Sequence, residues 1–265
     1  MKVEGFLDSF LKDIGVYRLY TWRLSDEVKG LPRPRHIGVI LDGNRRWAVA
    51  NEYPKWIGYS FGADKVENLM TWCLEYDVKA LTIYALSTEN LTRSKEDLDV
   101  IFSVISERLE KLLTDGSIQK HRVKVKGLGD LSLVPEEIKE KVLRLERVSA
   151  AHDSLYLNIA IAYGGRMEIV DAVKRLARDV EKGVVMPSKI DEETFSNYLF
   201  TSELPDPDPD LIIRTSGEVR LSGFLLWQSA YSELVFMDVY WPGFRKVDFL
   251  RAIRTYQRRQ RRFGR

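Results

Sequence analysis

The sequence predicts an α/β fold in which helices surround a parallel sheet of six strands. Its 265 residues fit one large domain, and its 45% of apolar residues can bury a substantial core. Short apolar runs alternate with longer segments of helical periodicity, which is typical of βα units around a parallel sheet. We therefore expect a single α/β domain.

The predicted strands are mostly apolar at consecutive positions, as is typical of strands covered on both faces. They span residues 36–42, 80–87, 123–129, 155–165, 210–217 and 233–241. The segment 205–210, a threefold Pro-Asp repeat, cannot be helical and is expected to form a stiff loop before the fifth strand.

Helical periodicity is clear in residues 97–113, where apolar side chains recur at spacings of three and four. This stripe comprises Leu98, Ile101, Phe102, Ile105, Leu109 and Leu112. Further helices are predicted over 60–76, 135–148, 167–181, 191–200 and 246–262. Because Phe6, Phe10 and Ile14 lie one helical turn apart, we expect an N-terminal helical extension over 1–34, followed by the main domain over 35–265.

The net charge of +2 conceals an uneven distribution of charge. Residues 245–265 carry nine basic side chains and one acidic one, which leaves the preceding 244 residues at −6. The single cysteine, Cys73, excludes an internal disulfide framework, fits a reducing compartment and is expected to be a core residue. No apolar stretch approaches the about 18 residues of a membrane span, and the first residues do not resemble a signal peptide. We therefore expect a cytoplasmic protein.

Four of the predicted strands end in polar or glycine-rich turns. If the strands are parallel, these turns share one edge of the sheet, where ligands bind in such folds. The turns are Asp42-Gly43-Asn44-Arg45-Arg46, Ser87-Thr88-Glu89-Asn90 with Arg93, Tyr163-Gly164-Gly165-Arg166, and Arg214-Thr215-Ser216-Gly217-Glu218 with Arg220.

This set of residues suits a polyphosphate held together with a divalent cation. Arginine presents a planar fork to phosphate oxygens, glycine lets the backbone approach an anion, and Mg²⁺ needs only one or two carboxylates besides substrate oxygens. One Asp-Gly-Asn segment alone is usually a turn, and one arginine alone is usually a solvated charge. Several polar turns at one edge favour a phosphate site. No P-loop or dinucleotide pattern supports a nucleotide ligand.

The segment HIGVILDGNRRWA (36–48) resembles the signature of the cis-prenyltransferases, the family of undecaprenyl and dehydrodolichyl diphosphate synthases. Four further blocks are similar in the same order, and the closing RRQRRFG (258–264) resembles the end of the family's chains. The blocks are GYSFGA (58–63), LTIYALSTENLTR (81–93), LNIAIAYGGR (157–166) and DLIIRTSGEVRLSGFLLWQSAYSELVF (210–236).

The resemblance implies a Mg²⁺-dependent transferase that condenses isopentenyl diphosphate onto an allylic diphosphate primer, with cis double bonds, to make a long polyprenyl diphosphate. It also implies a six-stranded, mostly parallel sheet and a homodimer. We expect peripheral contact with a membrane for product release and no nucleic-acid partner.

The resemblance also implies the roles of individual residues. Asp42 binds Mg²⁺ with Glu233 and assists departure of the allylic diphosphate, while Asn44 and Asn90 are the other catalytic residues. The Arg262-Phe263-Gly264 element reaches the active site of a partner chain. Expected substrate-binding residues are Gly43, Asn44, Arg45, Arg46, Trp47, Lys55, Tyr59, Ser87, Thr88, Glu89, Arg93, Arg214, Arg220, Ser222, Arg262 and Gly264.

A hydrocarbon product requires an apolar tunnel, for which the stripe on 97–113, the apolar residues of 60–76, Ala85 and Leu155 are candidates. By pattern alone such a stripe is usually core. The sequence departs from the family at Val219 and Tyr59, where histidines are common, and at Leu91, where tryptophan is common. Tyr59 does not titrate near neutrality as imidazole does, so metal coordination and substrate choice can differ from the family's.

Three other functions remain open. A noncatalytic subunit of a heteromer typically lacks the strand-tip aspartate, whereas Asp42 and Glu233 are both present. The basic C-terminal segment suits nucleic acid, but no groove-reading or aromatic-interleaved motif accompanies it. A kinase or phosphatase would need a nucleotide loop or a covalent nucleophile, and neither is evident.

Overall fold

The computed structural model describes the backbone of residues 2–259 and the side chains of residues 15–259. The predictions for Phe6, Phe10 and Ile14, and those for Arg262 and Gly264, lie outside the described side chains.

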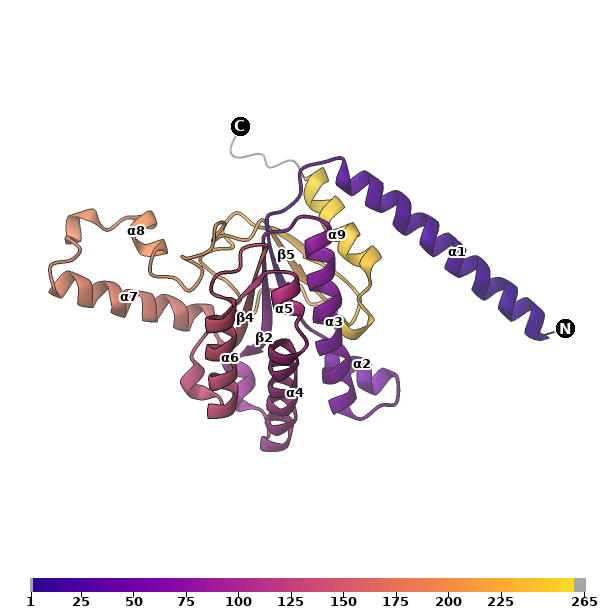
Figure 1. Ribbon diagram of the computed structural model, residues 1–265, viewed down its shortest axis with the longest axis horizontal. Coiled ribbons are helices and arrows are strands. Elements are labelled where there is room, and N and C mark those ends of the chain that lie inside the picture. The colour runs from indigo at the N-terminus through magenta and orange to yellow at the C-terminus, as the bar shows by residue number, and fades with distance from the viewer. Residues whose placement is uncertain (1, 260–265) are drawn as a thin grey trace.

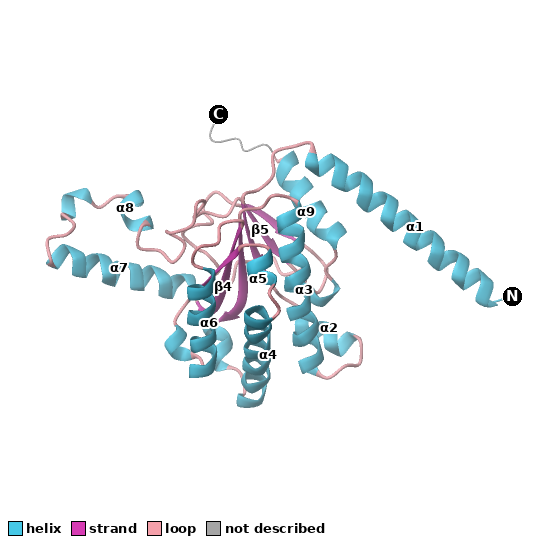
Figure 2. Cartoon of the chain, in the orientation of Figure 1, coloured by secondary structure: helices cyan, strands magenta, loops and turns pink. Residues whose placement is uncertain are grey.

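The centre of the molecule is a six-stranded sheet in which every pairing among the described residues is parallel (Figure 2). The strand order is β3-β4-β2-β1-β5-β6. The strands are β1 (His36–Ile40), β2 (Ala80–Ser87), β3 (Val123–Leu128), β4 (Leu155–Tyr163), β5 (Leu211–Arg214) and β6 (Glu233–Phe236). Because the strands are parallel, their carboxyl ends meet at one edge. The predicted α/β fold and its six strands are confirmed, although β5 and β6 end before the predicted residues 217 and 241.

Helices cover the sheet, and two of them extend away from it. Helix α4 lies between α3 and α6, whereas α1 and α7 extend from the body in different directions (Figure 1). The helices are α1 (Lys2–Lys29), α2 (Asn44–Ala50), α3 (Lys55–Glu75), α4 (Lys95–Thr114), α5 (Ser117–Lys120), α6 (Glu136–Ser149), α7 (Gly165–Glu181), α8 (Glu192–Ser196) and α9 (Lys246–Arg258). The start of α4 is capped by Ser94, whose Oγ accepts a hydrogen bond from the Asp97 backbone at 3.3 Å.

Helices α2, α5 and α8 differ from the sequence prediction, and α3 begins at Lys55 rather than at residue 60. Residues 44–50 form α2, where the sequence indicated only a turn. The reason is Gly43, whose left-handed backbone (φ 102°) turns the chain from β1 directly into a helix. The helix predicted over 191–200 ends at Ser196, and turns follow it.

The core lies on both faces of the sheet. Cys73 is fully buried on α3, which confirms its prediction as a core residue, and burial raises the pKa of its thiol well above the ordinary value. In the stripe on α4 only Ile101 and Leu109 are fully buried. The other members are part-buried.

Over residues 245–259, the basic segment at the end of the chain is largely paired with acidic side chains. Arg254 and Arg258 of α9 pair with Glu27 of α1 at 3.6 and 3.0 Å, and Lys246 pairs with Glu75 of α3 at 2.6 Å. Leu24 and Val28 are buried where α1 contacts α9. The charge asymmetry of the sequence therefore serves, over residues 245–259, to join α9 to the acidic remainder of the chain. Among residues 2–259, none of the helices combines the length and apolar character needed to cross a bilayer.

Candidate active site

A polar cavity of about 580 Å³ lies beyond the carboxyl ends of β1, β2 and β5. It is lined by residues that follow three separate strands, as the parallel sheet predicts. The predicted site residues that line it are Asp42, Gly43, Asn44, Arg45, Arg46, Tyr59, Ser87, Asn90, Arg93, Arg214, Arg220 and Ser222. The structure thus brings most of the predicted site into one cavity.

Asp42 is the carboxylate at the tip of β1. Its Oδ2 accepts a hydrogen bond from Arg214 Nη2 at 2.9 Å, and its Oδ1 accepts one from Arg46 Nη2 at 3.2 Å. Burial alone would raise the pKa of Asp42, but hydrogen bonds from Arg214 and Ser216 and the charges of Arg214 and Arg46 outweigh it and hold the pKa below its ordinary value. Asp42 is therefore ionised at neutral pH.

Arg214 is the most deeply buried cation of this cavity, with 4% of its side chain exposed. Its Nη1 donates to Ser222 Oγ at 2.8 Å and to the backbone oxygen of Arg220. Its Nε is buried and has no hydrogen-bond acceptor among the described residues. An N–H left without a partner in this position suits an incoming anionic oxygen.

Two polar residues were not among the predicted site residues: Glu218, which lines the cavity, and Ser216, which contacts the lining residue Arg46. Glu218 pairs with Arg46 at 3.3 Å and also with Arg220. Ser216 Oγ accepts a hydrogen bond from Arg46 Nη2 at 2.6 Å. Both belong to the polar turn after β5, so their place in that turn was the signal that could have found them. Their contacts hold the forks of two arginines in fixed positions.

Four predicted residues lie beside the cavity and do not line it. Lys55 pairs with Asp97 at 3.3 Å, and Asp97 also pairs with Arg45 at 3.3 Å. The ring of Trp47 packs against Phe61, with 5.2 Å between ring centroids. Thr88 lies against Gly164, where a Cβ would meet its hydroxyl at 2.6 Å, and Glu89 is exposed.

The structure does not place Glu233 next to Asp42 within one chain. Glu233 begins β6 in register with Leu211, and Leu211 is in register with Ile37 at the amino end of β1. Asp42 follows the opposite end of that strand, and Ile37 and Ile40 alone are separated by about 10 Å. Glu233 pairs with Arg259 at 3.1 Å.

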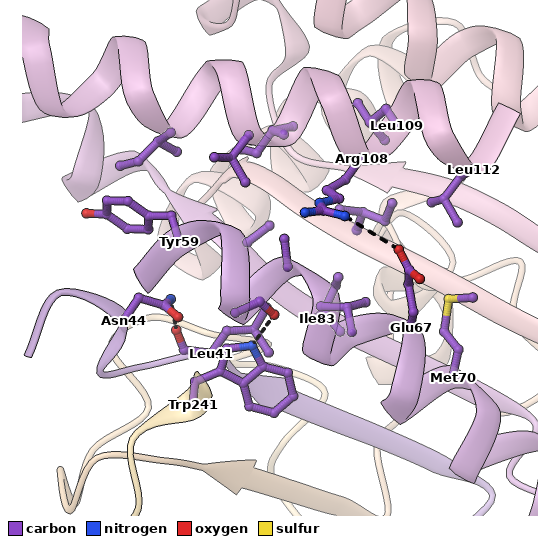
Figure 3. A pocket seen from close by; sticks show the side chains of 18 of the residues that line it. Leu41, Asn44, Tyr59, Glu67, Met70, Ile83, Arg108, Leu109, Leu112 and Trp241 are labelled. Carbon is purple, nitrogen blue, oxygen red and sulfur yellow. Dashed lines mark hydrogen bonds and ion pairs between the residues drawn. The ribbon is translucent and has the colours of Figure 1, made fainter. Parts of the chain in front are cut away.

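A second, apolar cavity of about 120 Å³ adjoins the polar one between α3, α4 and the sheet (Figure 3). The two share Leu41, Asn44, Tyr59, Ala85 and Ile101. Of the tunnel candidates, Ala85, Ile101, Ile105, Leu109 and Leu112 line the apolar cavity, whereas Leu98, Phe102 and Leu155 do not. A ligand with a polar head and a hydrocarbon tail would therefore fit both.

Tyr59 stands at the junction of the two cavities. Burial raises the pKa of its hydroxyl, although the charges of Arg93 and Arg45 act in the opposite direction. Arg93 Nη1 donates to Tyr59 Oη at 3.1 Å. The hydroxyl is thus neutral and acts as a hydrogen-bonding group rather than as a base.

Helices α2 and α3 approach closely at the same junction, and Gly58 makes the approach possible. A Cβ at Gly58 would lie 2.2 Å from the backbone oxygen of Asn44. Replacing Gly58 by alanine is expected to lower the free energy of unfolding by about 1–3 kcal/mol, because one helix must move away from the other. Urea denaturation measures this loss.

Gly15 of α1 is the matched control, since a Cβ there would meet no atom within 4 Å. Gly15→Ala should leave stability unchanged or raise it by up to about 1 kcal/mol, because alanine favours a helix interior. Equal losses in the two variants would contradict the close approach of α2 and α3.

Comparisons with known proteins cover nearly the whole chain. A family model described as "Putative undecaprenyl diphosphate synthase" matches residues 40–264. A curated relative from Methanopyrus kandleri is 50% identical over 250 residues, which make up 94% of this chain and 92% of the relative. One from Thermoplasma volcanium is 51% identical over 248 residues, or 94% of this chain and 95% of the relative. Both are named tritrans,polycis-undecaprenyl-diphosphate synthase (geranylgeranyl-diphosphate specific).

The fold is also similar to a solved structure. Lavandulyl diphosphate synthase from Lavandula x intermedia, in complex with dimethylallyl diphosphate, aligns with a TM-score of 0.85 and 34% sequence identity. The alignment covers 88% of this chain and 99% of that one. It therefore includes most of the sheet and helices that form the two cavities.

Proposed function

Because the chain belongs to the undecaprenyl diphosphate synthase family of cis-prenyltransferases, we propose that it extends an allylic diphosphate with isopentenyl diphosphate to a long polyprenyl diphosphate. The observation that carries this proposal is the junction of the two cavities. The polar cavity offers arginines and one carboxylate to diphosphate groups, and the apolar cavity offers hydrocarbon contacts to the prenyl tail.

The names of the relatives support geranylgeranyl diphosphate as the primer. A product with three trans bonds followed by cis bonds is what such a primer would yield if each added unit is cis. The preference for this primer and an undecaprenyl-length product are therefore our proposals for this chain.

The position of Asp42 suits a Mg²⁺ ion that is coordinated partly by the protein and partly by substrate oxygens. Among the described residues, no three His, Cys, Asp or Glu side chains gather into a metal-binding group. Mg²⁺ often uses one or two carboxylates and completes its shell with phosphate oxygens and water, so Asp42 with a diphosphate would suffice. When bound, the ion would stabilise the charge of the departing diphosphate.

The remaining steps depend on side chains that position the two substrates. Arg46 and Arg45 lie beside Asp42 and would bind the oxygens of the allylic diphosphate. Arg214, with its unpartnered Nε, and Ser222 would bind isopentenyl diphosphate so that its alkene faces the allylic carbon. Holding the two substrates in this orientation provides catalysis without a protein nucleophile.

We propose that Asn44 lies where the diphosphate and the prenyl tail would meet. It lines both cavities, its Nδ2 donates to the Leu41 carbonyl at 3.1 Å, and its Oδ1 is buried with no donor among the described residues. A neutral amide does not act as a base at neutral pH. We therefore assign Asn44 to orienting the substrate group that loses a proton when the new cis double bond forms.

We also propose that the chain acts as a homodimer with peripheral contact to a membrane for product release. The loop between β5 and the edge strand β6 carries the exposed apolar side chains Val219 and Trp227, which a second copy could cover. In this proposal Arg262 and Gly264 of one copy would complete the other's site. Sedimentation of the purified protein measures the oligomeric state.

The purified protein is expected to elongate geranylgeranyl diphosphate with labelled isopentenyl diphosphate in the presence of Mg²⁺. Chromatography of the lipid products measures their chain length. Farnesyl and dimethylallyl diphosphate are the comparison primers, and we expect less product from each than from geranylgeranyl diphosphate.

No elongation with any of the three primers would refute the proposed function. Elongation that requires a second, different chain would identify this protein as a subunit of a heteromer.

A further inference from the structure

An exposed apolar surface lies at the end of the hairpin that α2 and α3 form. Every residue from Val49 to Trp56 is exposed, and Val49, Tyr53 and Trp56 each keep at least half of their surface accessible. We call residues 49–56 the hairpin tip. Figure 1 shows α2 and the turn after it projecting from the body beside the lower half of α3. Exposed apolar residues that occur singly are common, but several large ones in so short a segment indicate an interaction surface.

Packed aromatic rings form the base of the hairpin tip. The Trp47 ring lies 5.8 Å from the Tyr53 ring and 5.2 Å from the Phe61 ring, measured between centroids. Phe61 belongs to α3 and is itself exposed, so it extends the apolar surface beyond the tip. The close approach of α2 and α3 at Gly58 holds the two helices together below these rings. The tip is therefore supported by two packed helices.

The hairpin tip lies close to the junction of the two cavities. Asn44 begins α2, Tyr59 lies near the start of α3, and both residues line both cavities. Val49 is five residues from Asn44, and Trp56 is three residues from Tyr59. These separations correspond to about 8 Å and about 5 Å along the helices. A surface that covers the tip would therefore also lie close to the polar cavity.

The exposed charge around the hairpin tip is mainly positive. Residues 45–57 contain three cations, Arg45, Arg46 and Lys55, and one acid, Glu52. Arg45 and Lys55 both pair with Asp97, but their side chains are 45% and 57% exposed, whereas that of Asp97 is 17% exposed. The cations therefore face solvent more than the acid that they share. Tryptophan and tyrosine combined with cations are typical of protein surfaces that contact lipid headgroups.

We propose that the hairpin tip docks on the surface of a bilayer that contains anionic lipids. This inference rests on the proposed function, whose primer and product carry hydrocarbon tails, and it names the surface that would contact the membrane. Docking would bury Tyr53 and Trp56 among the headgroups and bring the polar cavity close to the bilayer. A second copy of the chain suits the tip less well, because a two-fold contact between two tips would bring Arg45 and Lys55 against the same cations.

Sedimentation with lipid vesicles tests this inference without turnover. We expect the wild type to bind vesicles of mixed phosphatidylcholine and phosphatidylglycerol. The double variant Tyr53→Ser/Trp56→Ser should bind them at least about tenfold more weakly, because two aromatic side chains no longer become buried in the headgroup region. Both side chains are exposed and neither lines a cavity, so the variant should keep its fold and its turnover in detergent.

Leu19→Ser/Trp22→Ser is the matched control. Leu19 and Trp22 belong to α1 and are at least as exposed as Tyr53 and Trp56. This control should bind the vesicles as the wild type does. An equal loss in the two double variants, or a loss in the control alone, would overturn the inference. Failure of the wild type to sediment with the vesicles would overturn it as well.

The lipid charge provides a second test. Lys55→Gln should weaken binding to the mixed vesicles by about fivefold, because it removes one cation from an anionic surface. The same variant should bind vesicles of phosphatidylcholine alone as the wild type does. An equal effect of Lys55→Gln on both kinds of vesicle would contradict the part assigned to anionic lipid.

Two further outcomes separate this inference from the other proposals. If the wild type binds vesicles but elongates no primer, the proposed function fails and docking of the tip stands. If the wild type elongates primers but binds no vesicles, the inference fails and the proposed function stands. If Tyr53→Ser/Trp56→Ser changes the oligomeric state in sedimentation without vesicles, a second copy covers the tip and the inference is wrong.

Discussion

Replacing Asp42 by asparagine is expected to lower kcat by at least about 10²–10³-fold, the usual effect of removing one group that stabilises charge in the transition state. Asparagine has the same shape and can still accept a hydrogen bond from Arg214, so the fold should persist. What is lost is the negative charge that we propose holds Mg²⁺ against the departing diphosphate. Steady-state kinetics at saturating substrate and Mg²⁺ measure the loss.

Glu218→Gln is the matched control for Asp42→Asn. The side chains of Asp42 and Glu218 are 28% and 29% exposed, and both pair with Arg46. If the carboxylates serve only to neutralise arginines, the two variants should lose activity equally. We expect Glu218→Gln to lose less than about tenfold, because Glu218 does not lie at the tip of β1. Equal losses would refute the metal role of Asp42.

The pH dependence of the wild-type protein's stability should follow from the same carboxylate, and urea denaturation at several pH values measures it. Because the pKa of Asp42 is lower in the folded chain than its ordinary value, the interaction of Asp42 with its arginines is fully present above that ordinary value. Its contribution to stability is lost as the pH falls through the lowered folded pKa.

Removal of Mg²⁺ by a chelator should stop turnover at any pH, and added Mg²⁺ should restore it in the wild type.

The strands could be predicted from the sequence because strands covered on both faces are apolar at consecutive positions. The site edge could be predicted because parallel strands end together, which brought Asp42, Ser87 and Arg214 into one cavity. Helix α2 could not be predicted, because an Asp-Gly-Asn segment after a strand has the composition of a turn. The helix begins there because Gly43 adopts a left-handed backbone conformation, which only the structure shows.

Three predicted residues that do not line the polar cavity show what sequence patterns leave undetermined. Motif membership placed Lys55 and Glu89 at the site, but helix orientation turns Lys55 toward Asp97 and leaves Glu89 exposed. Glu233 lies in the same sheet as Asp42, but the register of β6 places Glu233 at the amino end of the strands. Arg108 lines the apolar cavity but was not among the tunnel candidates, because a charged residue on an amphipathic helix normally faces solvent.

Replacing Arg214 by lysine is expected to raise KM for isopentenyl diphosphate by at least about tenfold, since a hydrogen bond to a charged group contributes about 1.5–3 kcal/mol. Arg214 contacts Asp42 and Ser222 through its two terminal nitrogens, which leaves its buried Nε as the donor for a phosphate oxygen. Lysine keeps the positive charge but has one ammonium group in place of the planar fork, so it cannot make these contacts together.

Arg220→Lys separates the effect of geometry from that of charge. Arg220 lines the same cavity, but its side chain is 63% exposed and it pairs with Glu218, so a flexible ammonium can replace its guanidinium more easily. We expect a smaller rise in KM than for Arg214→Lys. Calorimetry with inorganic diphosphate should show the same order without turnover, because both residues bind the charged part of the substrate. If Arg220→Lys weakens binding as much as Arg214→Lys, positive charge alone would account for binding, and the buried Nε would have no special part in it.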